Sequence, residues 1–199
     1  MKRTAALLLA ALLTATAAAG CSSKEEGSSS SMGSSSSSMS SSESSSSMKS
    51  YRLNSDMTLE GLFDEIRTAF YDTNEMLMPE KVTMEVLERD FGLTSTQVKE
   101  VYGQYSTSPD SSDHLIVIQA QPGKAEEVKA ALERRQQDLM KRFEDYPKNG
   151  PYENAKAAKV HVMGDYVFYF GADMYPGNGD AEFDTRYSTV TEILNKSFS

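Results

Sequence analysis

The chain has 199 residues, a formal net charge of -9 and a single cysteine. One cysteine excludes an intramolecular disulfide, so a folded domain of this chain has to rely on its apolar core for stability. The excess of negative charge repels phosphate backbones and anionic lipid headgroups, which argues against a nucleic-acid-binding protein.

Residues 1–20 have the layout of a secretory signal peptide. Lys2 and Arg3 precede an apolar run over residues 5–19 that consists almost wholly of alanine and leucine. The run is shorter than the roughly 20 residues that a transmembrane helix needs. We therefore expect residues 1–20 to be removed, and the loss of two positive charges would change the net charge from -9 to -11.

Small residues stand directly before the only cysteine, in the segment Ala18-Ala19-Gly20-Cys21. This segment resembles the lipobox of bacterial lipoproteins, although a lipobox usually has Leu where this chain has Ala18. The resemblance implies cleavage between Gly20 and Cys21 and a lipid with palmitate on Cys21. The chain would then be anchored at the extracytoplasmic face of the bacterial cell membrane. The alternative is ordinary secretory cleavage that leaves Cys21 as a free thiol.

Residues 21–55 are predicted to be a disordered tether and residues 56–199 a single globular domain. The tether is mostly serine, and such a tract lacks the apolar area that would offset the entropy of ordering it. As a flexible coil it would span roughly 30 Å. The remaining residues have the size of one ordinary domain.

The domain is predicted to begin with helices. Thr58 is a suitable N-cap for the first. The apolar residues that follow share one helical face: Leu59, Leu62, Phe63, Ile66 and Phe70. A second short segment ends at Phe91-Gly92. We expect a further helix capped at Thr94 or Ser95, and then a polar loop over residues 106–112. The inward residues of that further helix would be Val98, Val101 and Tyr102.

A strand and the clearest helix of the chain follow. The apolar run from His114 to Ala120 predicts a strand, because Pro122-Gly123 ends it. The next helix has acids in its first turn and bases in its last, and Tyr146-Pro147 is expected to end it. Its buried stripe is predicted to be Ala125, Val128, Leu132, Leu139 and Phe143.

Two strands, Lys159–Met163 and residues 166–172, are predicted to form an antiparallel hairpin through Gly164-Asp165. The second is apolar on both faces, which indicates a central position in the sheet. A last helix is expected from Asp180, and its buried residues would be Phe183, Tyr187, Val190 and Leu194. These elements predict an α+β fold with a small three-stranded sheet, a split β-α-β unit plus the hairpin, packed with helices.

Several of these segments together resemble the domain of unknown function 4358 family over about residues 59–173. The segments are Gly92-Leu93, residues 113–118, Arg134-Arg135 with Phe143, Tyr146-Pro147 and Gly164-Asp165-Tyr166-Val167. Members of that family are exported bacterial lipoproteins. The resemblance implies a fold and a cellular location but no activity, so no catalytic residue can be assigned from it.

The two histidines offer few options for catalysis. His114 shares a strand face with Ile116 and Ile118, whereas His161 shares a face with Lys159 on an expected edge strand. The structural interpretation is that His114 is buried at a strand end and His161 is exposed. A titrating pair would require the two strands to bring them together.

An acidic stretch with two glycines could hold a calcium ion, although its spacing does not match an EF-hand. The candidate ligands are Asp173, Asn178, Asp180, Glu182 and Asp184. The favoured alternative is that Asp180 caps the last helix and the neighbouring acids interact with its positive end. We therefore predict no metal or other cofactor.

Two further features are candidate binding surfaces. Arg134, Asp138 and Arg142 stand four residues apart and predict a solvated charge ladder. With Arg135 and Lys141 the alternative is an anion-binding stripe. The loop that contains Tyr146, Pro147 and Tyr152 is a candidate recognition loop, because aromatic residues on stiff loops are common in glycan and peptide recognition. The alternative is that its tyrosines pack on the sheet.

Two functions of different classes remain. We expect an extracytoplasmic lipoprotein whose domain is a non-catalytic binding or assembly module, because the sequence lacks a nucleophile arrangement, metal cluster or cofactor fingerprint. Its partners would be the membrane, through the lipid on Cys21, and a cell-envelope protein or glycan. The alternative is a small hydrolase or transferase that uses scattered carboxylates on cell-envelope material.

Overall fold

The structure is a computed structural model that describes residues 51–71, 76–146, 150–171 and 179–199, with the backbone alone for residues 179–183. All of them lie in one compact unit, Ser45–Ser199. Its helices are α1 (Leu59–Phe70), α2 (Met84–Phe91), α3 (Ala125–Arg142), α4 (Pro151–Ala157) and α5 (Gly179–Ser197). Its strands are β1 (Pro79–Lys81), β2 (Val98–Ser106), β3 (His114–Ala120), β4 (Lys159–Met163) and β5 (Tyr166–Gly171).

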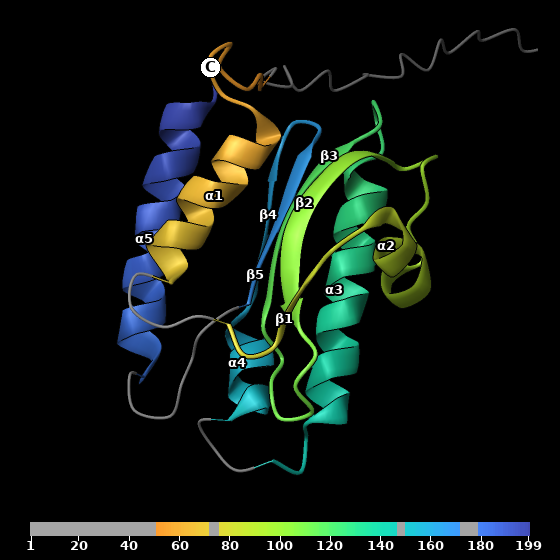
Figure 1. Cartoon of the computed structure of the whole chain (residues 1–199), viewed down its shortest axis with the longest axis vertical. Coiled ribbons are helices and arrows are strands. Elements are labelled where there is room, and N and C mark those ends of the chain that lie inside the picture. Colours follow the sequence, from red (N-terminus) through yellow and green to blue (C-terminus); the bar gives the residue numbers. More distant parts are fainter. Residues whose placement is uncertain (1–50, 72–75, 147–149, 172–178) are drawn as a thin grey trace, which may run out of the picture. The chain divides into compact units, whose positions relative to one another are not determined.

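The five strands form one antiparallel sheet in the order β1-β2-β3-β5-β4, with α1 and α5 on one face and α2 and α3 on the other (Figure 1). Because β5 is antiparallel to both β3 and β4, those two strands run parallel, with α3 in the connection between them. The α+β class, the split β-α-β unit and the hairpin are therefore confirmed. The predicted three-stranded sheet is wrong, since β1 and β2 extend it to five strands.

Each face of the sheet has its own apolar core, because successive side chains of a strand point to opposite faces. Phe168 and Phe170 of β5 pack toward α1 and α5, whereas Val167 and Tyr169 pack toward α2 and α3. All four side chains are fully buried. The two-faced apolar pattern of β5 thus correctly indicated a central strand, which lies between β3 and β4.

The helices with clear sequence signals form as expected. Thr58 caps α1 by accepting a hydrogen bond from the Gly61 N–H at 3.0 Å, and the buried stripe of α1 is the predicted one. Gly92 ends α2 with a left-handed φ of 68°, a conformation that suits glycine. The helix α3 ends at Arg142, and Phe143 is buried just beyond it, before Tyr146-Pro147 is reached.

The helix predicted after Thr94 is wrong, because residues 98–106 form β2. Thr94 does begin a single turn, since its carbonyl accepts from the N–H groups of Gln97 and Val98. A β-bulge then shifts the register between Val98 and Glu100. The extra residue places Val98 and Val101 on the same face of the sheet, so a spacing of three residues that is typical of a helix occurs in a strand.

The remaining differences concern short or terminal segments. Two short elements have no counterpart among the predicted ones, β1, whose three residues are all exposed, and α4, which has Pro151 in its first turn. Val190 and Leu194 of α5 are buried as predicted and Tyr187 is half-buried. The side chain of Phe183 and residue 172, predicted at the end of β5, lie outside the described residues.

Residues 51–54 pair with the C-terminal end of the chain. The Arg52 N–H donates to the Ser199 carbonyl at 3.2 Å, and Leu53 forms a β-bridge with Phe198. These residues of the predicted tether are thus part of the folded unit. Within the described residues, no helix combines the length and the apolar character that crossing a bilayer demands.

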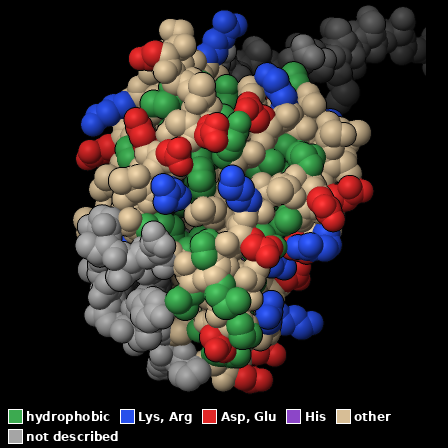
Figure 2. Space-filling model, viewed as in Figure 1, with side chains coloured by type: hydrophobic (Ala, Val, Ile, Leu, Met, Phe, Trp, Pro, Cys, Tyr) green, Lys and Arg blue, Asp and Glu red, His purple; other side chains and the backbone are tan. Residues whose placement is uncertain are grey.

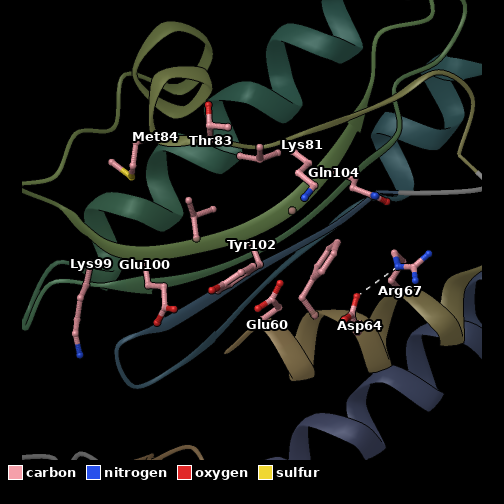
Figure 3. Close-up of a pocket in the computed structure, with 14 residues that line it drawn as sticks. Glu60, Asp64, Arg67, Lys81, Thr83, Met84, Lys99, Glu100, Tyr102 and Gln104 are labelled. Carbon is pink, nitrogen blue, oxygen red and sulfur yellow. Dashed lines mark ion pairs between the residues drawn. The ribbon is translucent and has the colours of Figure 1, made fainter. Parts of the chain in front are cut away.

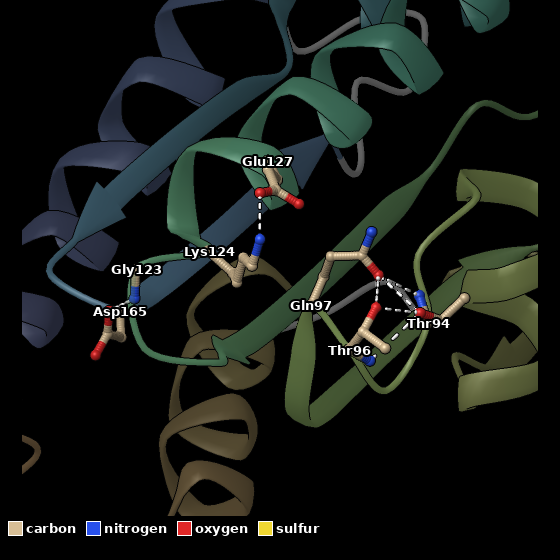
Figure 4. A network of polar contacts seen from close by, with 7 residues as sticks. All are labelled: Thr94, Thr96, Gln97, Gly123, Lys124, Glu127 and Asp165. Atoms are coloured by element: carbon tan, nitrogen blue, oxygen red, sulfur yellow. Dashed lines mark hydrogen bonds and ion pairs between the residues drawn. The ribbon is translucent and has the colours of Figure 1, made fainter.

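A polar network holds the turn that leads into β2 (Figure 4). The Gln97 Oε1 accepts hydrogen bonds from the Thr94 N–H at 3.1 Å and from the Thr94 and Thr96 hydroxyls at 2.8 and 2.9 Å. The Gln97 carbonyl accepts from the Gln121 N–H at 2.8 Å, which joins this turn to the end of β3. The first residues of β2 are therefore fixed by contacts outside the strand ladder.

Candidate functional site

A groove of about 660 Å³ lies between α1 and the sheet edge formed by β1 and β2 (Figure 3). One wall is α1, which contributes Glu60, Phe63, Asp64 and Arg67. The other wall is residues 81–84, and the floor is residues 99–104 of β2. The groove forms because β1 is only three residues long, so the chain turns away from β2 to enter α2.

Three acidic and three basic side chains line the groove, and they are Glu60, Asp64, Glu100, Arg67, Lys81 and Lys99. Figure 3 shows Glu60 and Glu100 near Tyr102, with Arg67 and Lys81 toward the other end. Desolvation, followed by the negative charges of Glu100 and Glu60, raises the pKa of Tyr102, and its hydroxyl is neutral at pH 7 as that of an ordinary tyrosine is. The end with the neutral phenol thus carries Glu60, Glu100 and Lys99, and the other, more basic end carries Arg67, Lys81 and Asp64.

One of the charges at the basic end is neutralised locally. The Arg67 Nε lies 3.7 Å from Asp64 Oδ1, and both side chains are largely exposed. Apolar side chains from both walls and the floor lie between the charged groups, and they are Phe63, Val82, Met84 and Val101. The volume falls in the range of roughly 300–1,000 Å³ that is typical of ligand sites. The lining suits a ligand that has both apolar and charged groups.

The surface around the groove carries charges of both signs. Figure 2 shows acidic and basic side chains together over α1 and β2, with apolar side chains between them. On a mixed surface of this kind the charged side chains orient a bound ligand, and the apolar side chains provide contact area.

His114 lies away from the groove, in the apolar core on the sheet face that α2 and α3 cover. Its Nδ1 is 2.9 Å from the Ser112 carbonyl, and its ring contacts Phe91, Tyr105 and Tyr169. Burial, followed by the charge of Arg135, lowers the pKa of His114 to about 4. The imidazole is therefore neutral at pH 7, with Nδ1–H donating to the Ser112 carbonyl.

The two histidines do not form a pair. His161 lies directly opposite Phe168 on β5 and hence on the α1 face of the sheet, whereas His114 is in the core of the opposite face. His161 is half-buried rather than exposed, and burial lowers its pKa. The structure thus confirms the buried position of His114 and gives no support to a shared titrating site.

The basic residues of α3 divide into two groups. Arg134, Asp138 and Arg142 are exposed, as predicted for a solvated face. Arg135 is half-buried, and its guanidinium carbon lies 5.6 Å above the centre of the Phe91 ring. Burial raises the pKa of the Tyr169 hydroxyl, and the charge of Arg135 acts in the opposite direction. Arg135 is thus part of the His114 environment and not of an exposed anion-binding stripe.

The candidate recognition loop is described in part. Tyr146 is 39% exposed, its ring packs edge-on against Phe143, and its hydroxyl donates to Asp110 at 3.3 Å. Tyr152 lies on α4 and packs against a small cluster that contains Phe143. Pro147 is outside the described residues. A recognition role for these tyrosines stays a prediction.

Other candidate residues also lie outside the described part of the chain. They are Gly20, Cys21, Asp173 and Asn178, and the side chains of Asp180 and Glu182. Across the described residues, no group of three His, Cys, Asp or Glu side chains is arranged to hold a metal ion. A calcium site at these acidic residues stays the less favoured of the two predictions for this segment.

A family model described as Domain of unknown function (DUF4358) matches residues 71–172, just over half of the chain. The chain belongs to this family. The resemblance inferred over residues 59–173 is confirmed for the shorter segment. No curated protein and no solved structure is a significant match to the chain.

The DUF4358 match covers the five strands with α2, α3 and α4, and it leaves α1 and α5 outside. The floor of the groove and its wall at residues 81–84 therefore belong to the DUF4358 segment, whereas the α1 wall does not. Sequence reasoning missed the groove because it assigned residues 98–102 to a helix. The available signal was the β propensity of Val98, Val101, Tyr102 and Tyr105.

Proposed function

We propose that this DUF4358 protein is a lipoprotein anchored through Cys21 at the extracytoplasmic face of the bacterial cell membrane, and that its domain is a non-catalytic binding module. The anchor is supported by the basic residues Lys2 and Arg3, the apolar run that follows and the small residues before Cys21. The serine-rich tract after Cys21 would hold the domain away from the lipid surface.

The groove between α1 and β2 is the proposed ligand site, and its geometry is the observation that carries the binding function. It combines about 660 Å³ of space with apolar walls and with charges of both signs at different positions. A protein or glycan of the cell envelope is the proposed ligand. Most of the groove's lining lies on the regular elements α1 and β2, and the wall at residues 81–84 includes the connection from β1 to α2.

Replacing the proposed lipidated cysteine should remove the anchor. Cys21→Ala is expected to abolish metabolic labelling with palmitate and to release the chain into the medium, because the thiol is the only site for the lipid. Ser22→Ala is the matched control and should leave labelling and membrane association unchanged. Continued labelling of Cys21→Ala would contradict the proposed anchor.

Site-specific cross-linking in cells tests whether the groove binds a ligand. A photoreactive phenylalanine analogue in place of Tyr102, inside the groove, is expected to give a discrete adduct after irradiation. The same analogue in place of Asp138, which is exposed on α3, should not give that adduct. Equal adduct patterns from both positions would argue against the groove as the ligand site.

A further inference from the structure

The outer edge of β2 is only partly covered. β1 pairs with residues 104–106 of β2. One residue after β1, the Val82 N–H donates a hydrogen bond of 2.9 Å to the Gly103 carbonyl, which is the last contact of this ladder. Met84 then begins α2, so the chain leaves the sheet. In an antiparallel ladder, alternate residues direct their N–H and C=O groups to the same side. The backbone groups of Val101 therefore point to the outer edge, where β1 provides no partner.

The groove lies along this uncovered edge. Val101 packs toward the core of the α2 face and Tyr102 toward that of the α1 face, and both line the groove. The groove thus reaches both sides of the strand at its edge. A segment in extended conformation could place its backbone beside Val101 and its alternate side chains against the two sides.

The two carboxylates beside Tyr102 favour a basic segment, although Lys99 also lines this end of the groove. Glu60 and Glu100 stand beside Tyr102 (Figure 3), and neither carboxylate is in an ion pair among the described residues. Glu100 and Tyr102 flank Val101 on the strand, and their side chains share the α1 side of the sheet. In an added strand, one residue would lie opposite Val101. The residues before and after it would then be cross-strand neighbours of Tyr102 and Glu100.

We propose that the groove binds an extended basic peptide segment of a partner protein, which adds as an antiparallel strand at Val101. An apolar residue opposite Val101 would lie beside Val82 and Met84, and lysine or arginine on either side of it would face Glu60 and Glu100. This inference rests on the proposed binding function, and it specifies the class of ligand and the way in which it is held.

The probe is the peptide acetyl-Ser-Thr-Lys-Val-Lys-Thr-Ser-amide, and its binding to the full chain is measured by calorimetry. Each amide nitrogen of the peptide is methylated in turn. Methylation of the central valine should weaken binding about tenfold, since it removes the donor to the Val101 carbonyl. Methylation of either lysine should have little effect, because those N–H groups face away from β2.

Variants of the chain test the same backbone contact at Val101. Val101→Pro removes the N–H that faces the open edge, while its ring also replaces the valine side chain and restricts φ to about −65°, and it should weaken binding about tenfold. Val101→Thr keeps the backbone donor and should bind like the original chain. Glu100→Gln should weaken binding of the lysine peptide, whereas the exposed Glu144→Gln makes the same charge change elsewhere and should not.

The outcomes separate this inference from the proposed function. Loss of binding in Val101→Pro and on methylation of the central valine supports strand addition. Binding that is insensitive to both changes overturns strand addition. If the peptide does not bind at all, the inference is overturned, and the bulge and charges at residues 99–100 are then better explained as protection of an edge strand. Cross-linking from position 102 would still decide the binding function in that case.

Discussion

Alanine in place of Phe170 is expected to lower the free energy of unfolding by about 3–5 kcal/mol. Phe170 is fully buried at the centre of the core on the α1 face. Its ring stacks with those of Phe70 and Phe168, each at a centroid distance of 5.9 Å. The substitution removes a large apolar side chain and leaves a cavity between the sheet and α1.

Urea unfolding monitored by circular dichroism measures this loss. Leu77→Ala is a suitable control, because Leu77 is 41% exposed and its truncation should change stability by no more than about 0.5 kcal/mol. Because α1 forms one wall of the groove, Phe170→Ala should also weaken any ligand bound there. A loss of stability no larger than that of the control would contradict the packing of α1 on the sheet.

The stability of the domain is expected to fall by about 3 kcal/mol between pH 7 and pH 4 because of His114 alone. The unfolded chain binds a proton at His114 near pH 6.5, whereas the folded domain binds it only near pH 4. Between these values the unfolded state holds the additional proton, so stability decreases as pH decreases. Above about pH 6.5 the neutral imidazole is present in both states and the effect vanishes.

The groups around His114 account for its low pKa and set the control. Its ring contacts Tyr105 and Tyr169. Burial and the charge of Arg135 from α3 lower the pKa of His114, whereas the hydrogen bond to the Ser112 carbonyl and the charge of Asp90 from α2 raise it. Asp90 also has a lowered pKa, mainly through its hydrogen bonds with Arg89. The contribution of Asp90 to stability is lost at lower pH. It is the same in both proteins when His114→Asn is compared with the original chain, so it cancels in the comparison. Identical pH dependence of the two proteins would contradict this account of His114.

The elements predicted correctly are those whose signals are local. The strand at His114–Ala120 and the hairpin at Gly164-Asp165 have turn residues at their ends, and α1 has both an N-cap and a complete apolar stripe. The strand β2 was missed because its bulge produces a helical spacing of apolar residues. β1 has no apolar signal at all, since its exposed residues are recruited only by pairing with β2.

The candidate site is harder to predict, because it depends on contacts between distant residues. Glu60 and Glu100 are 40 positions apart in the sequence and come together only after α1 packs across β2. The position of Arg135 also depends on contacts between distant residues. Its position in a run of charged residues indicated an exposed stripe, but the helix turns its side chain toward Phe91 and His114.

Amide hydrogen exchange tests the groove most directly as the ligand site, because it requires no knowledge of the ligand. The full chain is compared in native membranes, where we expect the ligand to be present, and after purification. Residues 99–104 of β2 and residues 60–67 of α1 should exchange more slowly in the membrane sample, since a ligand in the groove shields its floor and its α1 wall. Protection confined to Tyr146 and Tyr152, with no change in the groove, would contradict the account.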